Sequence, residues 1–443
     1  MPTRRTLLAA AALAAVSPEL MREAKETPVT ESDLPEGVIR PFDWTKQRIP
    51  VSAWDSQEAP IVDEAVTAAM RRYGIVGCGV CAVRESGVLY ARGFGYAELR
   101  GIPFLATTAT RCGSLAKCVT GLSALVLADQ KRLDLDAAVL PILKDAGIVP
   151  TPVGATQPDE RIARITVRHL MDHTSGLPRS ATYTAWRADR NVAALHHLRH
   201  VATGADVARD ALGNARLDSE PGMKFQYANA NFVLLARVIE ARSGLKFNDF
   251  LTRIAMPKFG LKPDEIYVSR NQNGPDSAAR GKNEPAYYQT SDERYVSFNP
   301  SEQSNGQVYG EAYRGYATEA SDGAGGIACT AVGLGKIIAN LHSAAPALSA
   351  WAIGQILTPP AHYSHEAGFN PARSNFYSKG FNVRFSGGRP WFSHSGMTNH
   401  CGGVIGHNAG YQFVAVSNWN APGPPYVDSL LDPALAEAVA KLS

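Results

Sequence analysis

The stretch that decides the fold reads RCGSLAKCVTGLSALVLADQ, residues 111 to 130. Ser114 and Lys117 stand at the front of an apolar run, 118–130, which predicts a buried helix. Residues i and i+3 of an α-helix point to the same side, so the lysine amine can lie close to the serine hydroxyl. If burial lowers the pKa of the Lys117 amine from about 10.4 toward neutrality, it can accept the serine proton. The spacing therefore defines a candidate nucleophile and its base.

The same spacing occurs a second time, at Ser243 and Lys246. This pair follows an amphipathic run over 232–242, and Gly244 has the position of a glycine that ends a helix. Ser114 instead opens a helix, where free backbone N–H groups and the positive end of the helix dipole stabilise an oxyanion. Ser114 is therefore the better candidate.

The composition is that of a globular protein with one large domain or two subdomains. Of 443 residues, 45% are hydrophobic and 19% are charged, and the formal net charge is +3. A chain of this length buries a substantial core, which argues against a disordered protein. The small net charge and the lack of a Lys/Arg-rich run give no reason to expect a nucleic-acid partner. A small molecule or a short peptide is the expected substrate.

The first residues carry the pattern of an export signal. Arg4 and Arg5 precede a short apolar stretch, 9–16, with small residues suited to cleavage. We expect a twin-arginine signal over 1–16 and a periplasmic or secreted protein; the alternative is an uncleaved N-terminal tail. No later stretch reaches the ~20 apolar residues of a membrane span.

The rest of the chain reads as an arm and one α+β domain. Residues 17–59 are rich in Pro and charge and lack clear periodicity, which indicates an extended arm on the surface. Within 60–442, strand patterns occur near both ends and helical patterns fill about 133–326. We expect an antiparallel sheet formed from both chain ends and flanked by helices, with an inserted, mainly helical subdomain and the active site in the cleft between the two parts. The expected helices are 61–73, 165–173, 192–201, 232–242, 247–256 and 427–442, and the expected strands are 75–84, 88–95, 381–385, 403–406 and 411–418.

The end of the insertion, residues 271–326, has a loop-like composition. It carries many Gly, Pro, Asn and Ser residues and scattered tyrosines. A loop of this length in a compact enzyme often forms one wall of the active site. A surface insertion is the alternative.

Two further short motifs follow the serine and the lysine along the chain. Tyr227-Ala228-Asn229 precedes a helix, and His394-Ser395-Gly396 lies just before the last pair of expected strands. In the order S-x-x-K, Y-x-N and H-S-G, the chain resembles the serine β-lactamase and penicillin-binding protein superfamily. The resemblance is to its class C-like branch, which includes carboxylesterases and DD-peptidases. It extends over about residues 59–420, with further similar segments at 168–178, 221–229, 238–244 and 325–330.

The resemblance implies a β-lactamase/transpeptidase-like fold and a role for each motif residue. Ser114 would attack a carbonyl carbon and form an acyl-enzyme. Lys117 and Tyr227 would share the proton, with either one as the formal base. Asn229 would hold the lysine or the acyl side chain of the substrate, and the backbone N–H groups of Ser114 and Met397 would form the oxyanion hole. No cofactor is implied, because these groups complete acyl transfer with water alone.

His394 bears on the choice of substrate. Many β-lactamases carry lysine there, a fixed cation suited to a substrate carboxylate, whereas histidine is mostly neutral near pH 7. With Ser395 and Gly396, His394 would line the substrate site, and histidine at this place resembles DD-peptidases and some esterases of the branch. We therefore expect a serine hydrolase of carboxylesterase or peptidase/amidase type. A true β-lactamase or acyltransferase is one alternative, and a non-catalytic penicillin- or peptide-binding module is another.

The histidine spacings elsewhere favour structural roles over metal sites. His169 and His173 have the spacing of a zinc pair, but the chain has no H-E-x-x-H sequence. His196, His197 and His200 lie in a polar helical stretch without nearby acidic or cysteine ligands, which favours a solvated face. We therefore expect no metal site.

The cysteines do not point to a further function, and the nucleophile motif of the α/β-hydrolases is missing from the sequence. Cys78 and Cys81 have C-x-x-C spacing, but they lie in a strand pattern, where an odd separation sends the side chains to opposite faces. A redox or zinc role is therefore disfavoured. The G-x-S-x-G sequence of α/β-hydrolases does not occur.

Overall fold

The computed structural model describes residues 41–53, 59–179, 188–274, 276–290, 295–303, 308–421 and 425–442. The expected signal segment, 1–16, lies outside the described residues, and so does most of the expected arm. The described part of that arm adds an edge strand, Val51–Ala53, to the main sheet. It also buries Trp44, whose indole N–H donates to the carbonyl of Ile75 at 2.8 Å. This part of the arm therefore packs into the core, because its one tryptophan finds both apolar contacts and an acceptor there.

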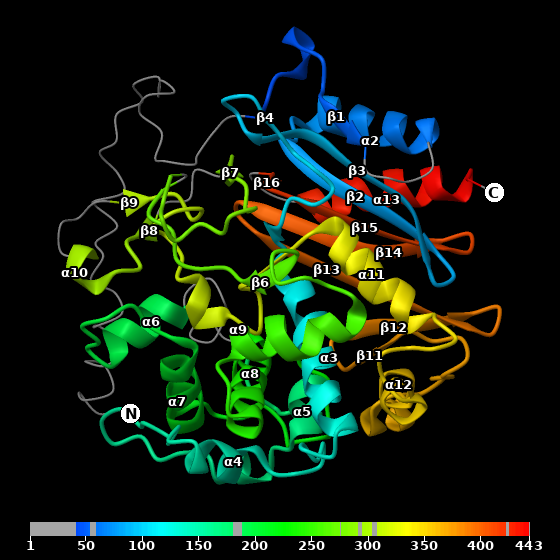
Figure 1. The fold of residues 1–443 in the computed structure, drawn as a ribbon. Coiled ribbons are helices and arrows are strands. Elements are labelled where there is room, and N and C mark those ends of the chain that lie inside the picture. Colours follow the sequence, from blue (N-terminus) through cyan, green and yellow to red (C-terminus); the bar gives the residue numbers. More distant parts are fainter. Residues whose placement is uncertain are drawn as a thin grey trace. The chain divides into compact units, whose positions relative to one another are not determined.

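Strands from both ends of the chain form one antiparallel sheet, as the sequence predicts (Figure 1). Its strands are β1 Val51–Ala53, β2 Gly77–Arg84, β3 Gly87–Glu98, β4 Ile102–Pro103, β11 Phe376–Ser378, β12 Phe381–Ser386, β13 Arg389–Thr398, β14 Cys401–Asn408 and β15 Tyr411–Ser417. Their order is β1-β3-β2-β15-β14-β13-β12-β11, with β4 paired to β3. β15 pairs with β2, so the last strands of the chain continue the hairpin that the first ones form.

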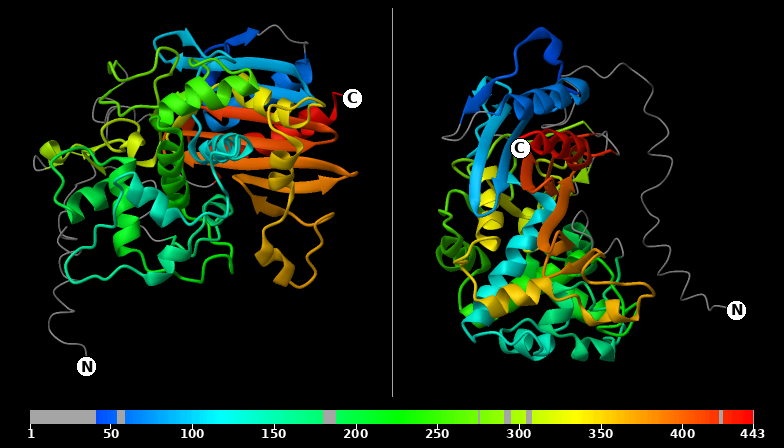
Figure 2. Two further views of the ribbon diagram at one scale, coloured as in Figure 1. Left: turned by 60° about the horizontal axis from the view of Figure 1, so that its bottom comes forward. Right: turned by 90° about the vertical axis from the view of Figure 1, so that its right-hand side faces the viewer.

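Helices cover both faces of this sheet, since its strands are apolar on both sides (Figure 2). α2 (Pro60–Tyr73) and α13 (Val427–Ala440) pack with Cys78 and Val80 of β2 on one face. α3 (Ala116–Asp129) and α11 (Ala331–Leu341) pack with Cys81 on the other. The two cysteines thus lie on opposite faces, as the strand pattern predicts. The α+β class is confirmed.

Residues 133–326 contain most of the short helices, and the bounds of that subdomain stay a prediction. The helices are α4 Val139–Asp145, α5 Val167–Met171, α6 Ala188–Leu195, α7 Gly204–Asn214, α8 Asn229–Ser243 and α9 Phe247–Phe250. The helix expected at 192–201 ends earlier, at Leu195, and α7 was not expected. Thr203 explains the second helix, because its side chain caps α7 by accepting the backbone N–H of Asp206.

A second sheet leads into the S-x-x-K segment. It has the order β5-β10-β6, with bounds Thr110–Arg111, Ile327–Cys329 and Ile266–Val268. The backbone N–H of Cys112 then donates to the carbonyl of Ile327 at 3.1 Å. The chain therefore enters the Ser114 turn from a fixed strand end.

The remaining elements are short. Two small pairs, β16 with β7 and β8 with β9, and the helices α10 and α12 complete the described strands and α-helices, and short 3₁₀ helices and one π-helical turn lie between them. Their bounds are β7 Tyr288–Gln289, β8 Tyr295–Val296, β9 Val308–Tyr309, β16 Trp419–Asn420, α10 Pro300–Gln303 and α12 Ala350–Leu357.

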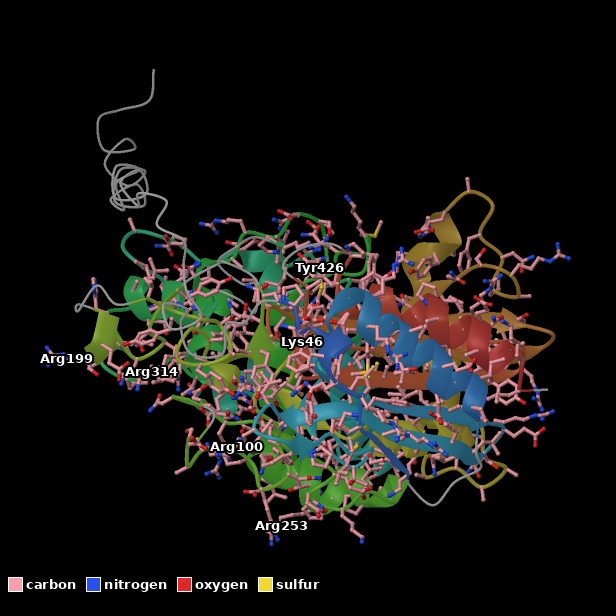
Figure 3. All side chains as sticks on the ribbon, turned by 90° about the horizontal axis from the view of Figure 1, so that it is seen from above. Lys46, Arg100, Arg199, Arg253, Arg314 and Tyr426 are labelled. Atoms are coloured by element: carbon pink, nitrogen blue, oxygen red, sulfur yellow. The ribbon has the colours of Figure 1, made fainter. Side chains whose placement is uncertain are left out.

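Charged side chains lie mainly on the outside. Arg100, Arg199 and Arg253 are exposed and project from the surface (Figure 3). In the part of the chain that the structure describes, no helix is both long and apolar enough to cross a membrane.

Four of the nine strands of the main sheet, β1, β4, β11 and β13, were not expected, and one of these carries a predicted motif. β13 carries His394-Ser395-Gly396, which the sequence placed before the last strands and not within one. Burial alternates from Phe392 to Thr398, but two of the buried positions are His394 and Gly396, so the sequence shows no alternation of apolar and polar residues. His, Ser and Gly also have little preference for strands. The motif therefore lies on a strand of the main sheet, paired with β14.

Candidate active site

Ser114 and Lys117 lie together at the start of α3. Ser114 belongs to a short 3₁₀ turn, Gly113–Leu115, and Lys117 to the first turn of the helix. The Lys117 amine donates to the Ser114 hydroxyl oxygen at 3.0 Å and to the carbonyl of Ala324 at 2.7 Å. Lys117 is fully buried, and burial lowers the pKa of its amine to about 7. A large fraction of this lysine is therefore neutral near pH 7.

The second S-x-x-K pair has no such setting. Gly244 ends α8 in the left-handed conformation, with φ 72°, as the sequence predicts. Among the described residues, the Ser243 hydroxyl bonds only to nearby backbone, for example the carbonyl of Glu240 at 3.4 Å. Ser243 thus closes a helix.

Tyr227 faces the same amine. Its ring centroid lies 4.8 Å from the Lys117 nitrogen. Burial raises the pKa of the Tyr227 phenol, and a hydrogen bond with Ser114 offsets part of that rise. The phenol therefore holds its proton near neutral pH, while the neighbouring amine gives its proton up.

His173 fixes the segment that carries Tyr227. Its Nδ1 accepts the backbone N–H of Ala228 at 3.2 Å and lies 2.9 Å from the Asn231 amide nitrogen. Its ring centroid is 4.3 Å from that of Tyr227. The structural role predicted for His173 is confirmed, and it consists in positioning the Y-x-N segment.

Two glycines bring the backbone of β13 against the Ser114 turn. A Cβ atom on Gly396 would lie 2.2 Å from the Cys112 carbonyl oxygen and 2.6 Å from the Ser114 nitrogen. A Cβ atom on Gly113, which has φ 53°, would lie 2.5 Å from the Met397 nitrogen. Only glycine allows this approach. The backbone nitrogens of Ser114 and Met397 are therefore near neighbours, as an oxyanion hole requires.

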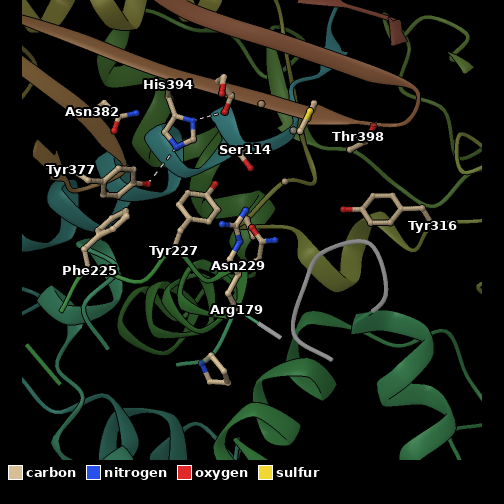
Figure 4. Close-up of a pocket in the computed structure, with 17 residues that line it drawn as sticks. Ser114, Arg179, Phe225, Tyr227, Asn229, Tyr316, Tyr377, Asn382, His394 and Thr398 are labelled. Carbon is tan, nitrogen blue, oxygen red and sulfur yellow. Dashed lines mark hydrogen bonds between the residues drawn. The ribbon is translucent and has the colours of Figure 1, made fainter. Parts of the chain in front are cut away.

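A pocket opens beside Ser114 and gathers most of the predicted site residues (Figure 4). The long segment 271–326 contributes Tyr316, Ala324 and Gly325 to the lining, so its last part forms a wall of this pocket. The described lining residues are Gly113, Ser114, Pro178, Arg179, Phe225, Tyr227, Asn229, Tyr316, Ala324, Gly325, Tyr377, Asn382, His394, Ser395, Gly396, Met397 and Thr398. Lys117 lies beneath this lining, bonded to Ser114 and Ala324.

His394 is neutral in this setting. Its Nδ1 donates to the Ser395 carbonyl oxygen at 2.5 Å, and its Nε2 lies 3.5 Å from the Tyr377 hydroxyl. Burial, together with the positive charge of Lys117, lowers the pKa of the imidazole to about 3. His394 therefore offers a polar, uncharged surface to the pocket. Ser395, the next residue of β13, is exposed and hydrogen-bonds to Asp428 of α13.

Asn229 begins α8 and lines the pocket. Its Oδ1 is buried without a hydrogen-bond partner among the described residues. The amine of Lys117 donates elsewhere, to Ser114 and Ala324. Of the two expected roles, contact with substrate is thus the one that the geometry favours, because a buried acceptor gains most from a bound donor.

Several lining residues were not found from the sequence. Tyr377 comes from β11, Phe225 precedes the Y-x-N segment, and Arg179 directly follows the similar segment 168–178. Only Arg179 and Phe225 border a motif, so only these two had a local signal. Tyr377 reaches the site through the pairing of distant strands, which no short pattern reveals.

The remaining histidines correct one expectation. His196 lies 2.7 Å from the carboxylate of Asp210, and His200 lies 3.2 Å from that of Asp206. The sequence showed no nearby acidic partner, because α7 brings both aspartates back from a later segment. His169 accepts the backbone N–H of Thr166 in a capping box. Within the described ranges no group of three or more His, Cys, Asp or Glu side chains could hold a metal ion.

The chain belongs to the Beta-lactamase family, whose model matches residues 62–439. Penicillin-binding protein 4* of Bacillus subtilis is 30% identical over 244 residues, which are 54% of this chain and 48% of that protein. Protein flp of Staphylococcus aureus is 26% identical over 199 residues, 45% of this chain and 36% of the relative. The chain thus spans about half or less of the length of these curated relatives.

Solved structures of other proteins share this fold, and three of them are compared below. The octameric penicillin-binding protein homologue from Pyrococcus abyssi has a TM-score of 0.59 at 19% identity, covering 87% of this chain and 77% of that one. D-amino acid amidase from Ochrobactrum anthropi SV3 has a TM-score of 0.59 at 17% identity, with 87% and 95% covered. D-alanine carboxypeptidase AmpC from Burkholderia cenocepacia has 0.56 at 14% identity, with 87% and 98% covered. The expected family and its β-lactamase/transpeptidase-like fold are confirmed.

Replacing Gly396 by Ala should lower the free energy of unfolding by about 1–3 kcal/mol, because the added methyl group overlaps the backbone of Cys112 and Ser114. Urea denaturation measures this. Gly354→Ala is the control: Gly354 lies within α12 with no atom within 4 Å of an added Cβ, so this change should raise stability by about 0.5–1 kcal/mol. Equal effects of the two changes would contradict the close approach of β13 to the Ser114 turn.

Proposed function

We propose that this protein is a serine hydrolase that forms an acyl-enzyme on Ser114 and acts on an ester or an amide. The observation that carries the proposal is the buried Lys117 amine, 3.0 Å from the Ser114 hydroxyl oxygen, with a pKa of about 7. A neutral amine at hydrogen-bond distance is what a serine needs in order to lose its proton as it attacks.

In the first step the Ser114 oxygen attacks the carbonyl carbon, and its proton passes to Lys117. The resulting oxyanion accepts hydrogen bonds from the backbone N–H groups of Ser114 and Met397. Each such donor stabilises a transition state by about 3 kcal/mol. Collapse of the intermediate breaks the bond to the alcohol or amine, which leaves with a proton supplied by Tyr227 and Lys117. Water then attacks the acyl carbon and gives a proton to the same pair of groups, and Ser114 regains a proton as the acid is released.

Lys117 is the better base of the two candidates. Burial lowers the pKa of its amine and raises that of the Tyr227 phenol, so the amine is the group that is free to accept a proton near pH 7. Tyr227 then acts as a donor, and its hydroxyl can protonate the leaving group and regain a proton from Lys117. The two groups form one coupled pair.

The environment of His394 supports an ester or amide substrate that needs no positive charge from this residue. The imidazole is neutral, and its Nε2 faces the Tyr377 hydroxyl. The amidase and the carboxypeptidase that share the fold act, by their names, on amides of D-amino acids and on D-alanine peptides. For this chain we propose a carboxylesterase or amidase, together with export to the periplasm or the medium through its twin-arginine segment.

Ser114→Ala should abolish turnover and prevent a covalent adduct with a serine-directed fluorophosphonate, because the nucleophile is lost. Intact mass spectrometry reads the adduct directly. Ser243→Ala is the matched control and should keep both, since Ser243 only closes α8. Adduct formation by the Ser114→Ala protein would refute the assignment. Absence of any adduct on the unmodified protein would favour a non-catalytic binding module.

The pH dependence of kcat/KM should report the pKa of Lys117. The value is lowered from 10.5 to about 7, so the ammonium form dominates below pH 7 and no base is available there. We expect kcat/KM to rise tenfold per pH unit in acid and to level off above a midpoint near 7. His394→Asn should leave the midpoint in place, because the pKa of that imidazole is about 3. A midpoint near 10 would contradict the role of Lys117.

A side-by-side assay decides among substrate classes. A short-chain p-nitrophenyl ester, a chromogenic cephalosporin and a D-Ala-containing peptide should be compared by kcat/KM. We expect kcat/KM for the ester or the peptide to exceed that for the cephalosporin by more than about tenfold, which corresponds to about 1.4 kcal/mol of transition-state binding. Preference for the cephalosporin would favour a true β-lactamase.

A further inference from the structure

Arg179 is the one permanently charged side chain among the described residues that line the pocket. The rest of that lining contains no other Arg or Lys and no Asp or Glu. Arg179 is exposed to solvent, and Figure 4 shows it on the side of the pocket where Asn229 lies, away from His394 and Tyr377. An uncompensated guanidinium at the rim of a binding pocket is the preferred partner of a carboxylate.

The backbone that carries Arg179 is held in place. The carbonyl of Gly176 accepts the backbone N–H of Asp218 at 2.8 Å, and the carbonyl of Leu177 accepts the Gln226 amide at 3.1 Å. Pro178, the residue directly before Arg179, has its own φ fixed by its ring. The Gln226 anchor is the neighbour of Tyr227, so the arginine and the catalytic segment are fixed to each other. An anion bound to Arg179 would therefore lie in a defined position relative to Ser114.

The other cationic groups near the pocket do not serve an anion. Lys117 is fully buried and its amine already donates to Ser114 and Ala324. His394 is neutral and bonded to the Ser395 carbonyl. Burial raises the pKa of Tyr227, and the charge of Arg179 offsets a small part of that rise, so this charge also reaches the reacting groups. The positive field in the open part of the pocket thus comes from Arg179.

We propose that Arg179 binds a carboxylate of the substrate, so that the preferred esters or amides carry an anionic group. This inference rests on the proposed hydrolase function. His394 stands where many β-lactamases carry a lysine, but the site would still recognise an anion. It moves that recognition from β13 to the opposite wall, where Arg179 and Asn229 lie.

Two matched pairs of substrates test the proposal, because each pair differs only by a carboxylate in place of a methyl group. 4-Nitrophenyl pentanoate with mono-4-nitrophenyl glutarate puts the charge on the acyl side. 4-Methylphenyl acetate with 4-acetoxybenzoate puts it on the leaving-group side. The readout is the ratio of kcat/KM for the anionic and the neutral member, which cancels their intrinsic reactivity when proteins are compared.

In Arg179→Gln this ratio should fall about tenfold for at least one pair, the effect of losing a charge-assisted hydrogen bond. Arg179→Lys should retain part of the preference, because it keeps the charge. Arg199→Gln is the control: it removes the same charge from an exposed position outside the pocket and should leave the ratio unchanged. Raising NaCl from about 0.05 to about 0.5 M should lower the ratio in the unmodified protein and not in Arg179→Gln.

A ratio in Arg179→Gln within twofold of the unmodified protein for both pairs would overturn the inference. Isothermal titration of the Ser114→Ala protein with the same pairs keeps the test independent of turnover. If adding Arg179→Gln to the Ser114→Ala protein abolishes its tighter binding of the anionic member of a pair, Arg179 binds the carboxylate, even if no ester is hydrolysed. If neutral esters are turned over and Arg179 affects neither binding nor rate, the hydrolase proposal stands and the proposed anion site is refuted.

Discussion

The site depends on one constraint, the burial of the Lys117 amine away from water. Lys117 lies in a helix that is buried along its length, between the main sheet and the segments that pack against it. Its only polar contacts are the Ser114 hydroxyl and the Ala324 carbonyl, among the described residues. Each unit by which burial lowers the pKa of Lys117 corresponds to about 1.4 kcal/mol of lost proton affinity. The rest of the fold supplies the packing that maintains this unfavourable environment for a charge.

The approach of two backbones is the second constraint, and it explains the position of the motifs. β12 pairs with β13 only as far as Ser393, so the following residues of β13 are free on that side to meet the Ser114 turn. Gly113 and Gly396 face each other's backbones at this contact. The nucleophile, its base and the two N–H groups therefore meet because a helix start and a strand edge touch without intervening side chains.

Much of this arrangement could be predicted from the sequence, and the failures have a common cause. Ser114, Lys117 and Tyr227 were found because local spacing and order along the chain carry their signal, and the sheet shared by both chain ends was found from its strand patterns. β13 was missed because the buried positions at its centre carry His394 and Gly396 rather than apolar side chains, so the sequence shows no alternating hydrophobic pattern. The place of Tyr377 in the pocket and the buried state of Lys117 depend on contacts between distant segments, which no short window of sequence contains. Asp210 follows His196 by only 14 residues, but their contact depends on α7, which was not expected.

The pairing of β2 with β15 also sets the order in which the molecule can form. Ser417 donates its hydroxyl to the carbonyl of Gly77 across 340 positions of sequence. A ribosome must therefore release the chain at least as far as Ser417 before the central strands of the sheet can meet, and α3 keeps an open face until then. Such long-range closure slows folding and exposes apolar surface while it is incomplete. A truncation that removes only the last strands would thus leave all three motif residues Ser114, Lys117 and Tyr227 in the chain and still fail to assemble them.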